Sequence, residues 1–199
     1  MKRFNDTVAG ESLLPKYTLL LAGGVALLYF LLPLPPPTWV YDRTHIESGA
    51  YWRLISGHFV HTDGQHLVCN LAALVLLGAV IERCSVTLFW TSFVFGMVAV
   101  DIGIYWAVPG LEQYCGLSGV LNTLWIVALG VAWNGINSRV MPLLGIAGAG
   151  KLAVEMSGDI AIFTDTAWPP LVESHVAGQI AGLVILSILV VIKLPLKKR

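Results

Sequence analysis

The amino-acid sequence predicts an all-α, polytopic membrane protein that folds as a bundle of six transmembrane helices. Of its 199 residues, 56% are hydrophobic and only 12% are charged, and its mean hydropathy is +0.76. A soluble domain has about a quarter of its residues charged. Crossing about 30 Å of hydrocarbon takes roughly 20 apolar residues. Six apolar runs approach this length, at residues 17–34, 67–81, 86–108, 116–133, 140–156 and 174–192.

The first run, 17–34, has the hydrophobic character of a secretory signal peptide. Asp6 and Glu11 precede it among the basic residues, however, and no Ala-x-Ala-like cleavage site follows it. We therefore expect a retained membrane anchor, and a single membrane domain over residues 1–199.

The basic residues predict how the chain is oriented. If the N-terminus is cytoplasmic, nine of the twelve Lys and Arg residues fall on the cytoplasmic side, against only Arg43 and Arg53 outside. The twelfth, Lys151, lies within the fifth run. Both termini are then cytoplasmic, and the long connections 35–65 and 157–173 are external. The sequence shows no basic groove interleaved with aromatic residues, so it does not indicate a nucleic-acid partner.

The fourth run begins in the stretch "YCGLSGVLN", where Ser118 stands between Gly116 and Gly119. These glycines let the backbone turn sharply and let a second helix or a substrate approach. The first N–H groups of a helix are unpaired and would stabilise an oxyanion. Ser118 is therefore either a nucleophile at the external end of the fourth helix or a small residue at a helix contact.

A nucleophilic serine needs a base, and histidine is the usual one. His175 opens the sixth run, and Gly178 and Gly182 follow it on the same helical face. If this glycine face packs against the fourth helix, His175 and Ser118 form a pair. Otherwise His175 is an interfacial residue that caps a helix.

The second run opens with His66 and Asn70, spaced four residues apart on one helical face. An imidazole N–H and a side-chain amide are both donors suited to an oxyanion. The alternative is that these polar side chains only hold the start of the helix.

Four motifs carry a resemblance to a known family. In chain order they are Trp52-Arg53 in the long first loop, His66-x-x-x-Asn70, Gly116-x-Ser118-Gly119 and His175-x-x-Gly178-x-x-x-Gly182. This set resembles the rhomboid family of intramembrane serine proteases. The short six-helix core is most similar to the rhombosortases, a bacterial branch of that family.

The resemblance implies a role for each motif residue. Ser118 would be the nucleophile and His175 its general base, in a dyad that lacks the carboxylate of a triad. His66, Asn70 and the backbone N–H of Ser118 would form the oxyanion hole. Trp52 would anchor the first loop at the membrane interface.

Arg53 would share this anchoring role. One position departs from the family pattern, because many rhomboids carry a tyrosine four residues after the serine, stacked on the catalytic histidine, and this chain has Asn122. Either another residue orients His175, or Asn122 does so by hydrogen bonding.

The resemblance to rhombosortases also implies a substrate and a location. The substrate would be a single-pass membrane protein, secreted or surface-bound, with Gly-Gly near the external end of its helix. Each glycine eases local unwinding by about 1 kcal/mol relative to alanine. The protein would lie among the lipids of the bacterial inner membrane, with its site facing the periplasm, and it would need no cofactor.

Two cysteines flank these motifs. Cys69 adjoins Asn70, and Cys115 precedes Ser118 by three residues. If the second helix approaches Ser118, the two cysteines approach each other, and we predict a Cys69–Cys115 disulfide on an external face where disulfides persist. The alternative is two unrelated small buried residues.

Three charged residues lie inside the apolar runs, at Asp101, Lys151 and Glu155. Intramembrane charges are candidates for function. Because the three lie at similar depth, we instead expect Lys151 to pair with Glu155 and with Asp101.

Two other functions compete with proteolysis. A catalytically inactive rhomboid-like protein would bind membrane helices without cutting them, although such relatives typically lack the serine or the histidine. A metal transporter or metalloprotease would use the polar cluster before the second helix, but no His-Glu-x-x-His motif occurs and we expect no metal. The cluster consists of His58, His61, Asp63 and His66.

Overall fold

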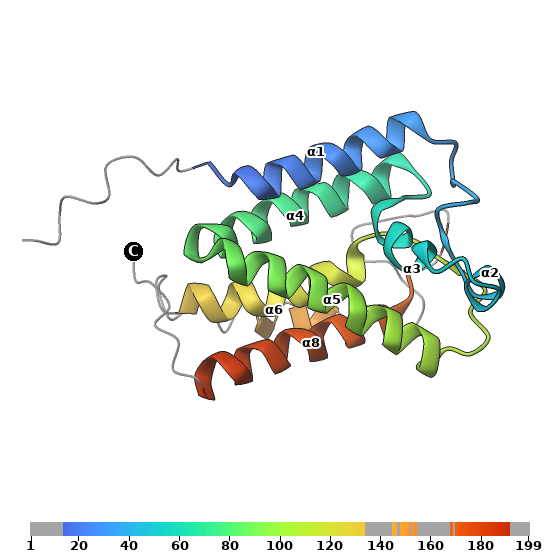
Figure 1. Cartoon of the computed structure of the whole chain (residues 1–199). Helices are drawn as coiled ribbons and strands as arrows, with labels where there is room; N and C mark the ends of the chain where they lie inside the picture. Colours follow the sequence, from blue (N-terminus) through green and yellow to red (C-terminus); the bar gives the residue numbers. More distant parts are fainter. Residues whose placement is uncertain are drawn as a thin grey trace, which may run out of the picture.

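A computed structural model describes residues 14–133, 145–146, 148–151, 153–154, 168 and 170–191. Long helices run side by side, and shorter elements gather at one end of the bundle (Figure 1). The elements are α1 (Lys16–Leu31), β1 (Tyr41–Asp42), α2 (Arg43–Glu47), α3 (Trp52–Ser56), the 3-10 helix η1 (Gly57–Phe59), α4 (Gly64–Cys84), α5 (Val86–Ala107), β2 (Gln113–Tyr114), α6 (Ser118–Trp133) and α8 (Val172–Val191).

The long helices coincide with the apolar runs of the sequence. Helices α1, α4, α5, α6 and α8 cover the first four runs and the sixth. Within the described residues, α4, α5 and α8 are long and apolar enough to cross a membrane, and α1 and α6 are shorter apolar helices. About half of the predicted fifth run, 140–156, lies outside the described residues, and those of its residues that are described are helical. The chain is a multi-pass membrane protein.

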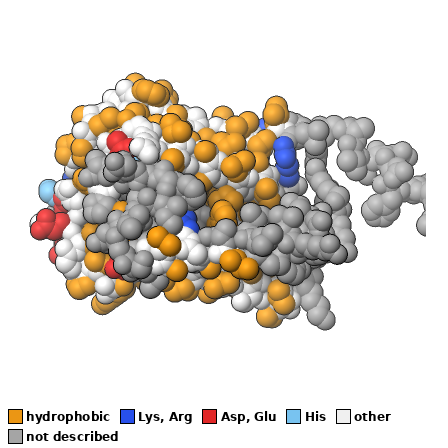
Figure 2. Space-filling model, turned by 180° about the vertical axis from the view of Figure 1, so that it is seen from behind, with side chains coloured by type: hydrophobic (Ala, Val, Ile, Leu, Met, Phe, Trp, Pro, Cys, Tyr) orange, Lys and Arg blue, Asp and Glu red, His pale blue; other side chains and the backbone are white. Residues whose placement is uncertain are grey.

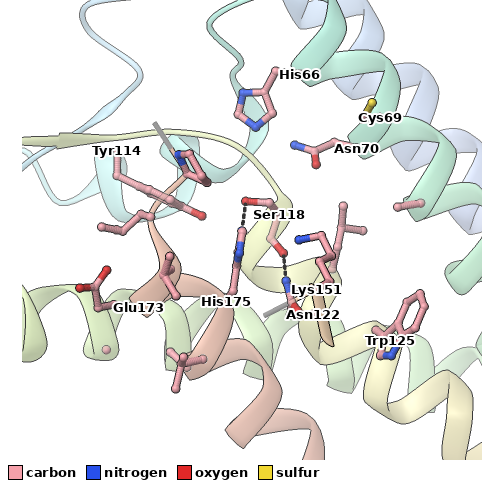
Figure 3. Close-up of a pocket in the computed structure, with 18 of the residues that line it drawn as sticks. His66, Cys69, Asn70, Tyr114, Ser118, Asn122, Trp125, Lys151, Glu173 and His175 are labelled. Carbon is pink, nitrogen blue, oxygen red and sulfur yellow. Dashed lines mark hydrogen bonds between the residues drawn. The ribbon is translucent and has the colours of Figure 1, made fainter. Parts of the chain in front are cut away.

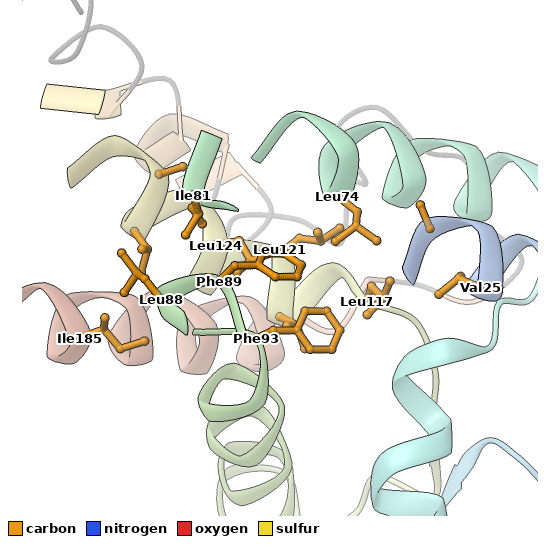
Figure 4. Packing of buried hydrophobic residues seen from close by; sticks show 14 of the residues in the cluster. Val25, Leu74, Ile81, Leu88, Phe89, Phe93, Leu117, Leu121, Leu124 and Ile185 are labelled. Carbon is orange, nitrogen blue, oxygen red and sulfur yellow. The ribbon is translucent and has the colours of Figure 1, made fainter. Parts of the chain in front are cut away.

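Helix α6 packs against α4, α5 and α8. Figure 4 shows the apolar side chains that fill the space between these helices. The fully buried ones include Leu74 and Ile81 of α4, Phe89 and Phe93 of α5, and Leu124 of α6. Lipid is as apolar as leucine, so this close packing, rather than escape from water, holds the helices together.

The surface changes character along the bundle axis. Figure 2 shows hydrophobic side chains across the middle of one face, and acidic and histidine side chains at the end that carries α2 and α3. Tyr51, Trp52 and Trp106 are exposed, and such aromatic residues favour the boundary between lipid and water.

A buried carboxylate joins α1 to α4 at the opposite end of the bundle. Glu82 accepts hydrogen bonds from the backbone N–H groups of Tyr17 (3.1 Å) and Thr18 (2.7 Å), and from the Thr18 hydroxyl (2.7 Å). The first N–H groups of a helix have no partner within it. Glu82 therefore caps α1 from a different helix, which the sequence pattern did not indicate.

Replacing Glu82 tests this cap. Glu82→Ala should lower the free energy of unfolding by about 1–3 kcal/mol, because it leaves buried donors at Tyr17 and Thr18 unpaired. Thermal melting in detergent measures the effect, with the exposed Glu112→Ala as the matched control. Equal melting temperatures for the two variants would show that the cap contributes nothing.

Candidate active site

Ser118 and His175 meet where α6 and α8 come closest. Ser118 is the first residue of α6, and its Oγ lies 3.0 Å from Nε2 of His175, which is 3% exposed. A Cβ atom at Gly178 would overlap the carbonyl oxygen of Gly119, so only glycine permits this approach. The structure thus brings together the serine and the histidine that the motifs singled out.

The turn that leads into α6 is held from several sides. Gly116 has φ of 106°, a conformation that favours glycine. Its N–H donates to the carbonyl of Gly57 (2.9 Å), and its carbonyl accepts from the Tyr114 hydroxyl (3.1 Å). Tyr114 also belongs to β2, which pairs antiparallel with β1, Tyr41 opposite Tyr114. The first loop therefore fixes the backbone just before Ser118.

His66 and Asn70 project from α4 toward Ser118 (Figure 3). The His66 ring lies against Gly116, where an added Cβ would approach its Nε2 to 2.6 Å. Nδ2 of Asn70 donates to Nε2 of His61 at 2.9 Å. Because an amide nitrogen carries two N–H groups, this bond leaves one for another acceptor.

Trp52 and Arg53 hold the first loop in different ways. Trp52 is 60% exposed, and its indole N–H donates to the Thr38 carbonyl at 3.2 Å. Arg53 is only 4% exposed and donates to the carbonyls of Pro37 (2.9 Å) and Val40 (3.0 Å). Arg53 therefore organises the loop from inside, rather than reaching into the membrane interface.

The predicted Cys69–Cys115 disulfide is wrong. All three cysteines are among the described residues, and no disulfide joins any of them. Cys115 packs into a small cluster with Val40 and Val60, on the side of the first loop, whereas Cys69 lies on α4 beside Asn70. Burial raises the pKa of the Cys115 thiol to about 12. Approach of the second helix to Ser118 therefore does not bring the two sulfurs to bonding distance.

Asn122 does not fill the place of a stacked aromatic ring. Its Nδ2 donates to the Ser118 carbonyl at 2.9 Å, and its Oδ1 accepts from Gln179 Nε2 at 3.0 Å. Both ends of the Asn122 amide are thus used by groups other than His175. Gln179 was not among the residues that the motifs singled out.

Asp101 has a partner that the sequence did not suggest. One of its oxygens lies 3.2 Å from Nε2 of the buried His58, in the 3-10 helix η1. The sequence had indicated Lys151 as the partner of Asp101; the expected Lys151–Glu155 pair involves Glu155, which lies outside the described residues. The Asp101–His58 contact ties α5 to the segment whose Gly57 carbonyl holds the turn before Ser118.

A cavity of about 1600 Å³ opens beside the site. Ser118, His175, His66 and Asn70 line it together with apolar side chains of α4 and α6, among them Leu76 and Trp125. Lys151 and Trp168 also line it. Within the described part of the chain, no group of three His, Cys, Asp or Glu side chains is placed to hold a metal.

Comparison with known families identifies the class of protein. The model of the Rhomboid domain matches residues 48–192, which is most of the chain and includes every motif residue named above. The chain therefore belongs to the rhomboid family. Its members are in general intramembrane serine proteases that act on membrane proteins within the bilayer, and some are inactive. A comparison with curated protein sequences found no match.

The burial of His61 predicts how stability depends on pH. Burial, with the neighbouring His66 as a smaller cause, lowers the pKa of His61 to about 3 from its ordinary 6.5. As the pH falls below about 6.5, the unfolded chain takes up a proton at this position and the folded chain does not. The free energy of unfolding should therefore fall by up to about 1.4 kcal/mol per pH unit until the pH reaches about 3.

Melting of wild type and His61→Gln between pH 8 and pH 4 measures this effect. Glutamine keeps an acceptor for Asn70 and does not titrate, so its melting temperature should fall less steeply below pH 6.5. Above pH 7 the two curves should run parallel. Parallel curves down to pH 4 would exclude His61 as a source of acid sensitivity.

Proposed function

We propose that this protein is an intramembrane serine endopeptidase in which Ser118 is the nucleophile and His175 the general base. The observation that carries the proposal is the 3.0 Å separation of Ser118 Oγ and His175 Nε2 inside a cavity. A base within hydrogen-bond reach of a hydroxyl is the geometric requirement for nucleophilic catalysis.

The reaction follows from this geometry. His175 Nε2 takes the proton of the Ser118 hydroxyl as Oγ attacks the scissile carbonyl carbon, and the carbonyl oxygen becomes an oxyanion. The oxyanion collapses, the peptide C–N bond breaks, and His175 returns the proton to the leaving amine. Water, activated by His175 in the same way, hydrolyses the acyl-enzyme.

The oxyanion would be stabilised from two helices. The backbone N–H of Ser118 is at the start of α6, where it has no partner within the helix. Asn70 offers its second amide N–H from α4, and His66 lies against the same turn. Gly116 keeps this space clear of a side chain, because a Cβ added there would meet His66 and Asn70.

We infer that the substrate is a single-pass membrane helix with Gly-Gly near its external end, as in the rhombosortase branch. The cavity supports this, because its apolar lining from α4 and α6 suits a helix arriving from the lipid. A scissile amide must leave its helical hydrogen bonds before Ser118 can attack it. Paired glycines lower that cost by about 1 kcal/mol each.

The proposal also covers how the single domain lies in the membrane. We infer six spans, the fifth being 140–156, cytoplasmic termini and a site that faces the periplasm across the bacterial inner membrane. The positive-inside count of the sequence supports this orientation.

Labelling with a fluorophosphonate probe tests the dyad. Wild-type protein in membranes should label, because the probe traps an activated serine. Ser118→Ala should abolish labelling, and His175→Ala should slow it about 10²–10⁴-fold through loss of the base. Ser187→Ala, which removes a hydroxyl on α8 that bonds only to the helix backbone, should label like wild type.

The outcome separates the protease from the inactive alternative. Well-folded wild-type protein that neither labels nor cleaves a helix ending in Gly-Gly would indicate a protein that binds membrane helices without cutting them. Labelling together with cleavage that shows no preference for a Gly-Gly helix over an Ala-Ala helix would keep the protease and reject the rhombosortase substrate.

A second test addresses the oxyanion donors. Asn70→Ala should lower kcat about 10²–10³-fold with little change in KM, because an oxyanion donor acts in the transition state. Val68→Ala, at an exposed position on the same helix, is the matched control. A rise in KM at unchanged kcat would instead assign Asn70 to substrate binding.

A further inference from the structure

A second pair of polar side chains joins α6 and α8, one helical turn from the Ser118–His175 pair. Asn122 follows Ser118 by four residues and Gln179 follows His175 by four, so each shares a helical face with its site residue. Gln179 donates to Asn122 at 3.0 Å, and Asn122 donates to the Ser118 carbonyl at 2.9 Å. A continuous bridge thus runs from α8 to the backbone of the nucleophile.

The chemistry of the groups fixes the direction of this bridge. The Ser118 carbonyl only accepts, so the amide nitrogen of Asn122 must face it. The oxygen of Asn122 then faces α8 and requires a donor there, which Gln179 supplies through Nε2. The Asn122 nitrogen must therefore donate and its oxygen must accept. Rotation of either the Asn122 or the Gln179 amide by 180° would break a hydrogen bond.

The rest of the interface is built on close packing at glycines. An added Cβ at Gly178 would collide with the Gly119 carbonyl, and one at Gly182 would collide with Ile126 of α6. Farther along the helices, Leu186 of α8 lies in the space beside Gly130 of α6. Hydrogen bonds between the helices add a directional constraint to this packing at the level of the site.

Besides the Ser118–His175 contact itself, two side-chain hydrogen bonds join α6 and α8 within the described residues. One is the Gln179–Asn122 bond, and the other runs from the Thr123 hydroxyl to the Gly178 carbonyl at 2.9 Å. Only the first continues to Ser118, through Asn122. The Thr123 bond therefore offers a comparison that joins the same helices without a connection to the nucleophile.

We propose that Asn122 and Gln179 are positioning residues, which hold Ser118 and His175 in register for proton transfer. The proposal rests on the proposed protease function. The 3.0 Å separation of Oγ and Nε2 depends on where α6 and α8 stand along their axes, and the bridge ties that register to the Ser118 backbone. A misplacement of about 1 Å between reacting groups can cost about 100-fold in rate.

Variants of similar volume separate positioning from stability. Gln179→Met and Asn122→Leu each remove the bond while roughly keeping the side-chain volume, and each leaves a half-buried polar partner without this bond. Replacing both partners with apolar groups can restore stability. The double variant Asn122→Leu/Gln179→Met should therefore melt near wild type, yet still react with a fluorophosphonate about 10–100-fold more slowly.

The labelling rate is measured as a function of the fluorophosphonate concentration, which gives a maximal rate constant and a half-saturation concentration. The bridge should affect the rate constant and leave the half-saturation concentration unchanged, and cleavage of a Gly-Gly helix should show the same split between kcat and KM. Thr123→Val is the matched control, since it removes the Thr123–Gly178 bond between the same helices. It should lower the melting temperature and leave the rate constant within about twofold of wild type.

Each outcome bears on a separate claim. The positioning role is wrong if the double variant has both the melting temperature and the rate constant of wild type. It is also wrong if Thr123→Val slows the reaction as much as the double variant does, because the bridge then only packs the helices. If wild-type protein does not react at all, the protease function itself fails, and the positioning role fails with it. Slow reaction of a stable double variant supports the bridge as a positioning device.

Discussion

The contact between Gly119 and Gly178 is the constraint on which the site depends. It brings the backbones of α6 and α8 together at the level where Ser118 and His175 face each other. Any side chain at Gly178 would separate the helices and widen the Oγ–Nε2 distance beyond hydrogen-bond reach. Apolar helices gain no hydrophobic free energy when they leave lipid for each other. Close van der Waals packing therefore provides the attraction between α6 and α8.

The external elements stabilise the turn that leads into this contact. In the first loop, β1 pairs with β2, Arg53 donates to backbone carbonyls, and Gly57 accepts a hydrogen bond from Gly116. These bonds fix the turn before Ser118, so that α6 begins at this residue, which lines the cavity.

Much of this arrangement was predictable, because a bilayer imposes strict rules. Long apolar runs must be helices, and α1, α4, α5, α6 and α8 follow the predicted runs closely. The glycines beside Ser118 and His175 indicated a close contact, and the structure brings these two residues together. Such predictions rest on local spacing, which a single sequence displays.

The features that were missed depend on pairs far apart in the chain. The Glu82 cap, the His58–Asp101 contact and the Asn122–Gln179 bridge each join residues more than forty positions apart. Periodicity does not show such pairs. The disulfide prediction failed for a related reason, since proximity of two helices does not specify which way a cysteine such as Cys115 points.

The Glu82 cap has a consequence for how the chain is assembled during synthesis. Thr18 lies 64 positions before the carboxylate that satisfies its N–H, so α1 is made long before its partner on α4. Until α4 has been inserted, the start of α1 can find its hydrogen bonds only in water or lipid headgroups. During synthesis α1 would then be only weakly fixed in the membrane. It would reach its final depth and tilt only after α4 has inserted and packed beside it.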